Sequence, residues 1–274
     1  MNFIAFSRKP GSGGTEIARK AADQLGYNFY DTDAIEQVAR EMGFLESVRE
    51  IDEKAPSLFR RFFSQKPTVD LERLSSVVYE LARRGNAVFL GRGSQILLRS
   101  FNCSLNVRVT ASRETRIRNL VARGYHEEAA AAALDRSDHE RGAFIRFAFG
   151  VDWDTPELYD IVLNMDKLTV ELAVNTVINL ASSEAIQACS VDALRSIECM
   201  ALLHRAEAAI LEAELAYGQP GAVSVTVLEP GHVELTGYVG SEVTRTRAEE
   251  VVRAVRGVEA VQNRIRVVPA DRFA

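Results

Sequence analysis

Short apolar runs alternate with amphipathic stretches along the first two thirds of the chain. Residues 87–90 (Ala-Val-Phe-Leu) are wholly apolar, as expected of a strand buried on both faces. Residues 105–109 and 159–163 predict further strands, and the spacing of apolar positions in 68–84 and 113–123 predicts helices. Strands that alternate with helices predict a mainly parallel sheet, covered by helices on both faces and joined by right-handed crossovers.

The pattern changes after about residue 182. Residues 191–217 form one alanine-rich segment with helical character, which a Gly-Gln-Pro-Gly break at 218–221 ends. Apolar and polar residues then alternate strictly in 223–227 and again in 233–239. That alternation on both sides of a turn predicts a β-hairpin with one buried face.

A further helix is predicted at residues 241–256, and 261–268 alternate once more. A long helix, a hairpin and a second helix are enough to form a small α+β unit with its own core. The sequence therefore predicts two domains, residues 1–182 and 192–270.

A glycine cluster separates the first apolar run from the helix-forming run that follows it. It reads Gly11, Ser12, Gly13, Gly14 and then Thr15. Such a strand, loop and helix is typical of a P-loop, whose backbone amides and helix dipole hold phosphate. Thr15 stands where that motif places its magnesium-binding hydroxyl, but Gly14 replaces the usual lysine. The loop predicts a phosphate site; a glycine turn that binds nothing is the alternative.

The missing lysine normally bridges the outer phosphates and offsets charge in the transition state. Arg8 occupies the position of the first glycine of the motif, and Lys9 follows it. Either could supply positive charge from the other side of the loop. We expect Arg8 to be catalytic, whereas for Lys9 a solvated basic residue is nearly as good an explanation.

Two more candidates follow predicted strands. Asp31 ends the strand at 27–30, where it could reach magnesium-bound water or an acceptor, or equally cap the next helix. Arg92 stands between two glycines after the strand at 87–90. Ligands bind at the carboxyl edge of open parallel sheets, so Arg92 is predicted to bind phosphate bidentately. A structural pair with a carboxylate is its alternative.

Arg136 and Arg141 belong to a strongly charged run at residues 135–141 of a predicted helix. Alternating charge on a helix is usually a solvated face that ion pairs stabilise. The sharper interpretation is an arginine-bearing helix that closes over a transferred phosphate.

Composition limits the classes of function. Acidic residues outnumber basic ones 38 to 33, so no general attraction to nucleic acid is expected. No apolar run reaches membrane-spanning length, and the N-terminus is a poor signal peptide. The three cysteines have no metal-ligand spacing, which favours reduced thiols and a cytoplasmic protein.

Together these motifs resemble the cytidylate kinase-like family of P-loop nucleotide kinases, over about residues 1–182. The resemblance implies phosphoryl transfer from ATP, with Mg²⁺, to a nucleoside monophosphate such as CMP or dCMP. It implies that Gly11 to Thr15 hold the donor phosphates, that Arg92 binds the acceptor, and that Arg136 and Arg141 belong to the lid. The matching segments are residues 6–15, 29–31, 91–93, 149–153, 159–164 and 168–174.

Three positions depart from well-studied cytidylate kinases. Gly14 stands for the lysine, Gln37 for an arginine, and Gly93 for an aspartate. These departures leave a second hypothesis open. In it the chain is a non-catalytic nucleotide sensor, which binds phosphate without turnover and signals through its tail.

The tail, roughly residues 192–268, resembles a BON domain in the hairpin at 223–239 and in the run 257–263. Such domains are thought to bind phospholipid or partner proteins. The resemblance implies a docking or sensing module; it identifies neither the ligand nor the oligomeric state.

Overall fold

The computed structural model describes residues 1–43, 67–187, 190–215 and 223–268 of the 274-residue chain. The break predicted at 218–221 lies outside these residues. The described residues divide into two compact units. One contains 1–38 and 84–190, and the other contains 39–43, 67–83 and 191–268.

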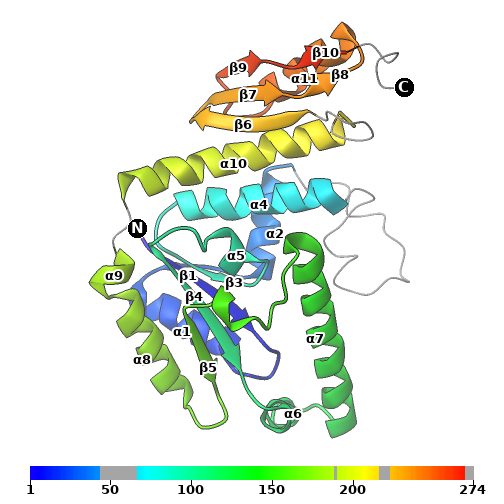
Figure 1. Cartoon of the computed structure of the whole chain (residues 1–274). Helices are drawn as coiled ribbons and strands as arrows, with labels where there is room; N and C mark the ends of the chain where they lie inside the picture. The colour runs from blue at the N-terminus through cyan, green and yellow to red at the C-terminus, as the bar shows by residue number, and fades with distance from the viewer. Residues whose placement is uncertain (44–66, 188–189, 216–222, 269–274) are drawn as a thin grey trace. The chain divides into compact units, whose positions relative to one another are not determined.

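The first unit contains a five-stranded, wholly parallel sheet in the order β2-β3-β1-β4-β5 (Figure 1). The first strand along the chain is central, so the loop that follows it emerges in the middle of the carboxyl edge. This sheet, flanked by helices, confirms the predicted α/β class. The strands are β1 (Phe3–Arg8), β2 (Asn28–Tyr30), β3 (Ala87–Leu90), β4 (Ser104–Thr110) and β5 (Ile161–Asn164).

Two helices pack on one face of this sheet and share its core. In α1 (Gly14–Leu25) the buried side chains are Ile17 and three alanines, and α8 (Val170–Ala181) adds Ala173, Val174 and Val177. The predicted cap of α8 is confirmed, because the Thr169 hydroxyl accepts the Leu172 amide at 3.2 Å. The other helices of this unit are α5 (Ser94–Leu97), α6 (Arg113–Val121), α7 (Glu127–Phe149), η2 (Pro156–Leu158) and α9 (Glu184–Gln187); α2 (Thr32–Glu41) crosses the division.

The second unit packs a helix pair and small sheets around an apolar core. The three-stranded sheet has the order β6-β7-β9, and β8 pairs with β10 separately. The sequence predicted one strand at 233–239 and one at 261–268. Each is two strands, interrupted at Gly237, whose φ is 122°, and at residues 264–265, while their parallel pairing keeps one register on both sides of the break. The elements are α4 (Pro67–Arg83), α10 (Val191–Glu212), β6 (Ser224–Glu229), β7 (His232–Thr236), β8 (Tyr238–Val239), α11 (Glu242–Arg253), β9 (Ala260–Asn263) and β10 (Arg266–Val267).

Helix α4 lies along α10 (Figure 1). Both belong to the second compact unit, although α4 falls inside the predicted first domain of residues 1–182. The predicted boundaries, 1–182 and 192–270, stay a prediction.

The cysteines only partly follow the expectation of reduced thiols. Cys199 is free and partly exposed. Cys103 is fully buried and disulfide-bonded, so the expectation is wrong for this residue. Cys189 lies outside the described residues. Among the residues described, no helix is long and apolar enough to cross a membrane.

The sheet offers a matched test of core packing. Val107 in β4 is fully buried, whereas Val162 in the neighbouring β5 is 47% exposed. Val107→Ala should lower the free energy of unfolding by about 2 kcal/mol, because it removes two buried methyl groups and leaves a cavity. Val162→Ala should cost less than about 1 kcal/mol. Urea unfolding monitored by circular dichroism checks both, and equal losses would contradict the described core.

Candidate functional site

The glycine loop joins the central strand β1 to helix α1. Gly13 is the N-cap residue of α1, with a φ of 82°, and the helix begins at Gly14. Two side chains hold the loop by hydrogen bonds to its backbone carbonyls. The Ser12 hydroxyl donates to the Lys9 carbonyl at 2.7 Å, and the Asn119 amide donates to the Gly11 carbonyl at 2.9 Å. The first-turn amides of α1 have no partner within the helix, so they are available to an anion.

The loop borders a cavity of about 200 Å³ that brings most of the predicted phosphate-site residues together. Ser12 is the exception within the loop, since its buried side chain bonds back to the loop itself. The lining residues are Arg8, Lys9, Pro10, Gly11, Gly13, Gly14, Thr15, Glu16, Leu120, Arg123 and Arg141.

The Arg8 side chain occupies the space that a P-loop lysine would need. A Cβ atom on Gly14 would lie 2.6 Å from the Arg8 Cβ, closer than real Cβ contacts allow. A Cβ on Gly91 would lie 2.6 Å from the Arg8 Nη1. The arginine therefore extends from the end of β1, beside Gly14, to the segment after β3. Position 14 has no lysine because the Arg8 side chain fills the space that the lysine would need.

Arg8 and Arg141 line the cavity together with Lys9 and the exposed Arg123, and all four contribute positive charge. The Arg141 Nη1 donates to the Arg8 carbonyl at 2.8 Å, so helix α7 is held against the loop. Neither guanidinium group forms an ion pair with a carboxylate in the part of the chain that the structure describes. Burial and the charge of Arg141 lower the pKa of Arg8 to about 9, while Asp31 opposes the shift. Burial also lowers the pKa of Arg141, against the attraction of Asp138. A bound anion would relieve both.

A further arginine near the loop, Arg108, was not predicted as part of the site. Arg108 in β4 is buried and donates to the Ser7 hydroxyl at 2.7 Å and to the Asp154 carboxylate at 2.6 Å. Its guanidinium lies 4.0 Å from the ring centroid of Trp153, a cation–π contact. Lys9 pairs with the same Asp154 at 3.1 Å. Lys9 is thus a partly exposed residue that pairs with a carboxylate while it lines the cavity, and Arg108 is held in place by its neighbours.

The charged run at 135–141 forms ion pairs and also contributes one arginine to the loop cavity. Asp138 pairs with the buried Arg116 at 2.8 Å, and Asp135 pairs with Arg113 at 2.9 Å, as the ion-pair alternative predicted. Arg141 points to the loop cavity, whereas Arg136 is exposed on α7 and does not line it. The lid role of Arg136 stays a prediction.

The two predicted acceptor residues both have structural partners. The Arg92 Nη2 lies 2.9 Å from the Glu36 carboxylate, and both side chains are buried. Asp31 accepts the Ala34 amide at 3.1 Å, which caps α2, and faces Arg19 at 3.4 Å. The structural alternatives for both residues are therefore realised, and acceptor binding by either one stays a prediction.

Phe149 explains another departure from the usual kinase pattern. A Cβ on Gly93 would overlap the Phe149 ring, so the position expected to hold an aspartate has no room for a side chain. This residue ends α7, the helix that also carries Arg141.

Comparison with known proteins agrees with this architecture. The family model for the cytidylate kinase-like family matches residues 3–167, and that for the BON domain matches residues 207–269. A cytidylate kinase of Ignicoccus hospitalis is 30% identical over 182 residues, covering 65% of this chain and 97% of that protein. A cytidylate kinase of Staphylothermus marinus is 27% identical over 180 residues, covering 65% and 94%.

A solved structure shows the same fold. The crystal structure of a protein from Eubacterium ventriosum superposes with a TM-score of 0.54 at 22% identity. It covers 67% of this chain and 99% of its own. At this identity the likeness concerns the fold alone.

Exchanging the two loop residues tests the packing of Arg8. Gly14→Lys alone should destabilise the protein by about 1–3 kcal/mol, because its Cβ meets the Arg8 side chain. Arg8→Gly combined with Gly14→Lys recreates the usual P-loop spacing and should recover most of that loss. Thermal unfolding of the four proteins of this double-mutant cycle measures the coupling. Additive effects would show that the two positions do not compete for space.

Proposed function

Because the chain belongs to the cytidylate kinase-like family, we propose that it transfers a phosphoryl group from ATP to a nucleoside monophosphate. CMP or dCMP is the proposed acceptor, since cytidylate kinase is the name that its relatives carry. The observation that carries the proposal is the pair of unneutralised guanidinium groups, Arg8 and Arg141, in the glycine-loop cavity.

Phosphoryl transfer needs positioning and charge stabilisation more than covalent chemistry. The amides from Gly11 to Thr15 would hold the donor phosphates at the start of α1. Arg8 would supply the charge that the lysine supplies elsewhere, and Arg141 would stabilise the transferred group from α7. Both side chains line the same cavity.

A magnesium ion would lie beside Thr15, a hydroxyl-bearing residue that lines the glycine-loop cavity. Thr15 would hold the ion, as its position in the motif implies. The ion, when bound, would neutralise charge on the donor phosphates.

Acceptor binding would use the segment after β3 and the end of β2. Arg92 would have to exchange Glu36 for the acceptor phosphate. Asp31 would face the acceptor or magnesium-bound water.

For the tail we propose docking or sensing, with a protein or a phospholipid surface as its partner. The cytoplasmic location also stays a proposal. A non-catalytic nucleotide sensor is the alternative function, and Gly14 in place of the lysine is the observation in its favour.

Coupled detection of ADP release over a panel of nucleoside monophosphates separates the two functions. We expect turnover well above the ATPase background with CMP or dCMP. Nucleotide binding by calorimetry without turnover for any acceptor would support the sensor instead.

Arg8→Ala should lower turnover at least about 100-fold while the protein stays folded, because it removes charge stabilisation near the transferred group. Arg99→Ala, at an exposed position outside the cavity, is the matched control and should leave the rate unchanged. Full activity of the Arg8 variant would refute the role proposed for this residue.

A further inference from the structure

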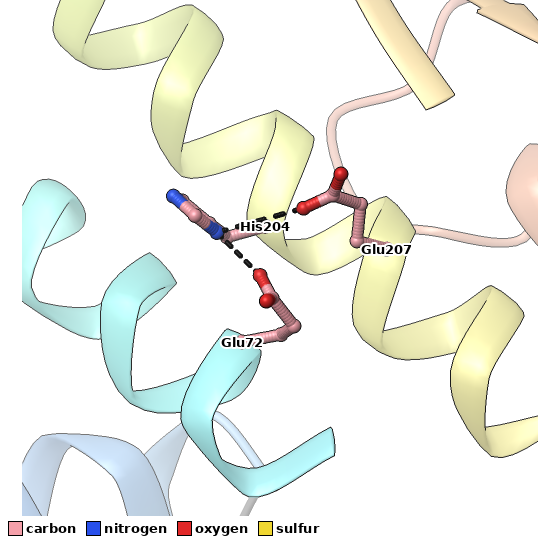
Figure 2. A group of neighbouring side chains, drawn as sticks. All are labelled: Glu72, His204 and Glu207. Atoms are coloured by element: carbon pink, nitrogen blue, oxygen red, sulfur yellow. Dashed lines mark hydrogen bonds and ion pairs between the residues drawn. The ribbon is translucent and has the colours of Figure 1, made fainter. Parts of the chain in front are cut away.

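Three side chains meet between α4 and α10, in the second unit and outside the glycine-loop site (Figure 2). Glu72 projects from α4, and His204 and Glu207 from successive turns of one face of α10. The His204 Nδ1 lies 2.5 Å from the Glu72 Oε2 and 3.7 Å from the Glu207 Oε2. One ligand atom from each residue lies within 4.8 Å of the other two.

The imidazole is held in a fixed orientation. The Tyr79 ring, about two turns after Glu72 on α4, stacks on the His204 ring. The interplanar angle is 7° and the ring centroids are 5.5 Å apart. The side chains of His204 and Glu72 are only 16% and 22% exposed. Because its packing already fixes the His204 ring, Nδ1 faces the carboxylates and binding would cost little additional side-chain entropy, as for a preorganised ligand.

Negative charge is in excess at this point. Two carboxylates face a single imidazole, and one oxygen of each lies within 4.8 Å of the other and of the ring nitrogen. Two carboxylates this close are stable together only when a proton or a cation lies between them.

We propose that Glu72, His204 and Glu207 bind a divalent transition-metal ion of the zinc class, which links α4 to α10. One imidazole nitrogen and two carboxylate oxygens form a mixed donor set that suits zinc, whereas magnesium prefers oxygen donors and retained water.

The spacing fits an ion with small side-chain movements. Ligand bonds of about 2.1 Å in a tetrahedral site place donor atoms roughly 3.4 Å apart. The two Nδ1 distances, 2.5 and 3.7 Å, lie on either side of that value. Three protein ligands leave a fourth position for water. The ion would replace the hydrogen bond between His204 and Glu72, and so join two helices that are far apart in the sequence.

Zinc titration of the full-length, chelator-treated protein by calorimetry tests the site. We expect one high-affinity zinc equivalent that millimolar magnesium does not displace. Glu72→Gln, His204→Ala and Glu207→Gln should each weaken this binding at least tenfold. Glu198→Gln makes the same charge change elsewhere on α10, and Cys199→Ser removes the free thiol on that helix; both controls should retain wild-type affinity.

Thermal unfolding shows whether a variant that fails to bind zinc is still folded. Zinc should raise the unfolding temperature of the wild type and of both controls, but not of the three ligand variants. Without zinc, Glu207→Gln should be as stable as the wild type or more so, since it removes a repelling charge. Absence of the zinc equivalent in the wild type, or unchanged affinity in the ligand variants, would overturn the proposal. The cluster would then be a hydrogen-bonded link between helices.

Discussion

The close packing of Arg8 against Gly14 is the constraint on which the rest of the site depends. A loop that lacks the usual lysine would bind phosphate with backbone amides alone, yet here an arginine from the preceding strand fills the vacated volume. Its far end needs Gly91 to be without a side chain, and its carbonyl anchors Arg141 of α7. One residue thus couples the strand, the loop, the segment after β3 and helix α7. The missing lysine at position 14 and the arginine at position 8 therefore belong to one arrangement.

The surroundings of the loop keep its two guanidinium groups available. Lys9 and Arg108 share Asp154, and Arg116 is neutralised by Asp138, so these three cations are already paired, whereas Arg123 lines the cavity from an exposed position. Charge that is paired in this way positions the loop but contributes little to ligand affinity. Arg8 and Arg141 have no such partner among the described residues, and their buried charge makes an anion the natural occupant of the cavity.

Local patterns predicted most of the elements, and long-range partners explain what they missed. The strand at 87–90 and the cap at Thr169 depend on neighbouring residues only, so the sequence was enough. The break of the tail strand between β7 and β8 falls at Gly237, whose φ is 122°, although the pairing with 260–267 keeps one register on both sides; alternation does not record this break. Arg108 went unnoticed because its partner Asp154 is 46 residues away. Arg136 and Arg141 looked equivalent in the sequence, and only the direction of each side chain from α7 distinguishes them.

Helix α4 belongs to the compact unit that contains the tail, so the tail is not simply appended after the first domain. It lies inside the segment that the kinase-like family model matches, yet it packs along α10, whose last residues from 207 onward belong to the BON match. Val77, Val78 and Tyr79 follow one another in α4 and are almost wholly buried. The match with the kinase of Ignicoccus hospitalis covers 97% of that protein, so little of it is left for an equivalent of the tail. A chain cut before α10 would therefore leave the side of α4 that packs along α10 without a cover.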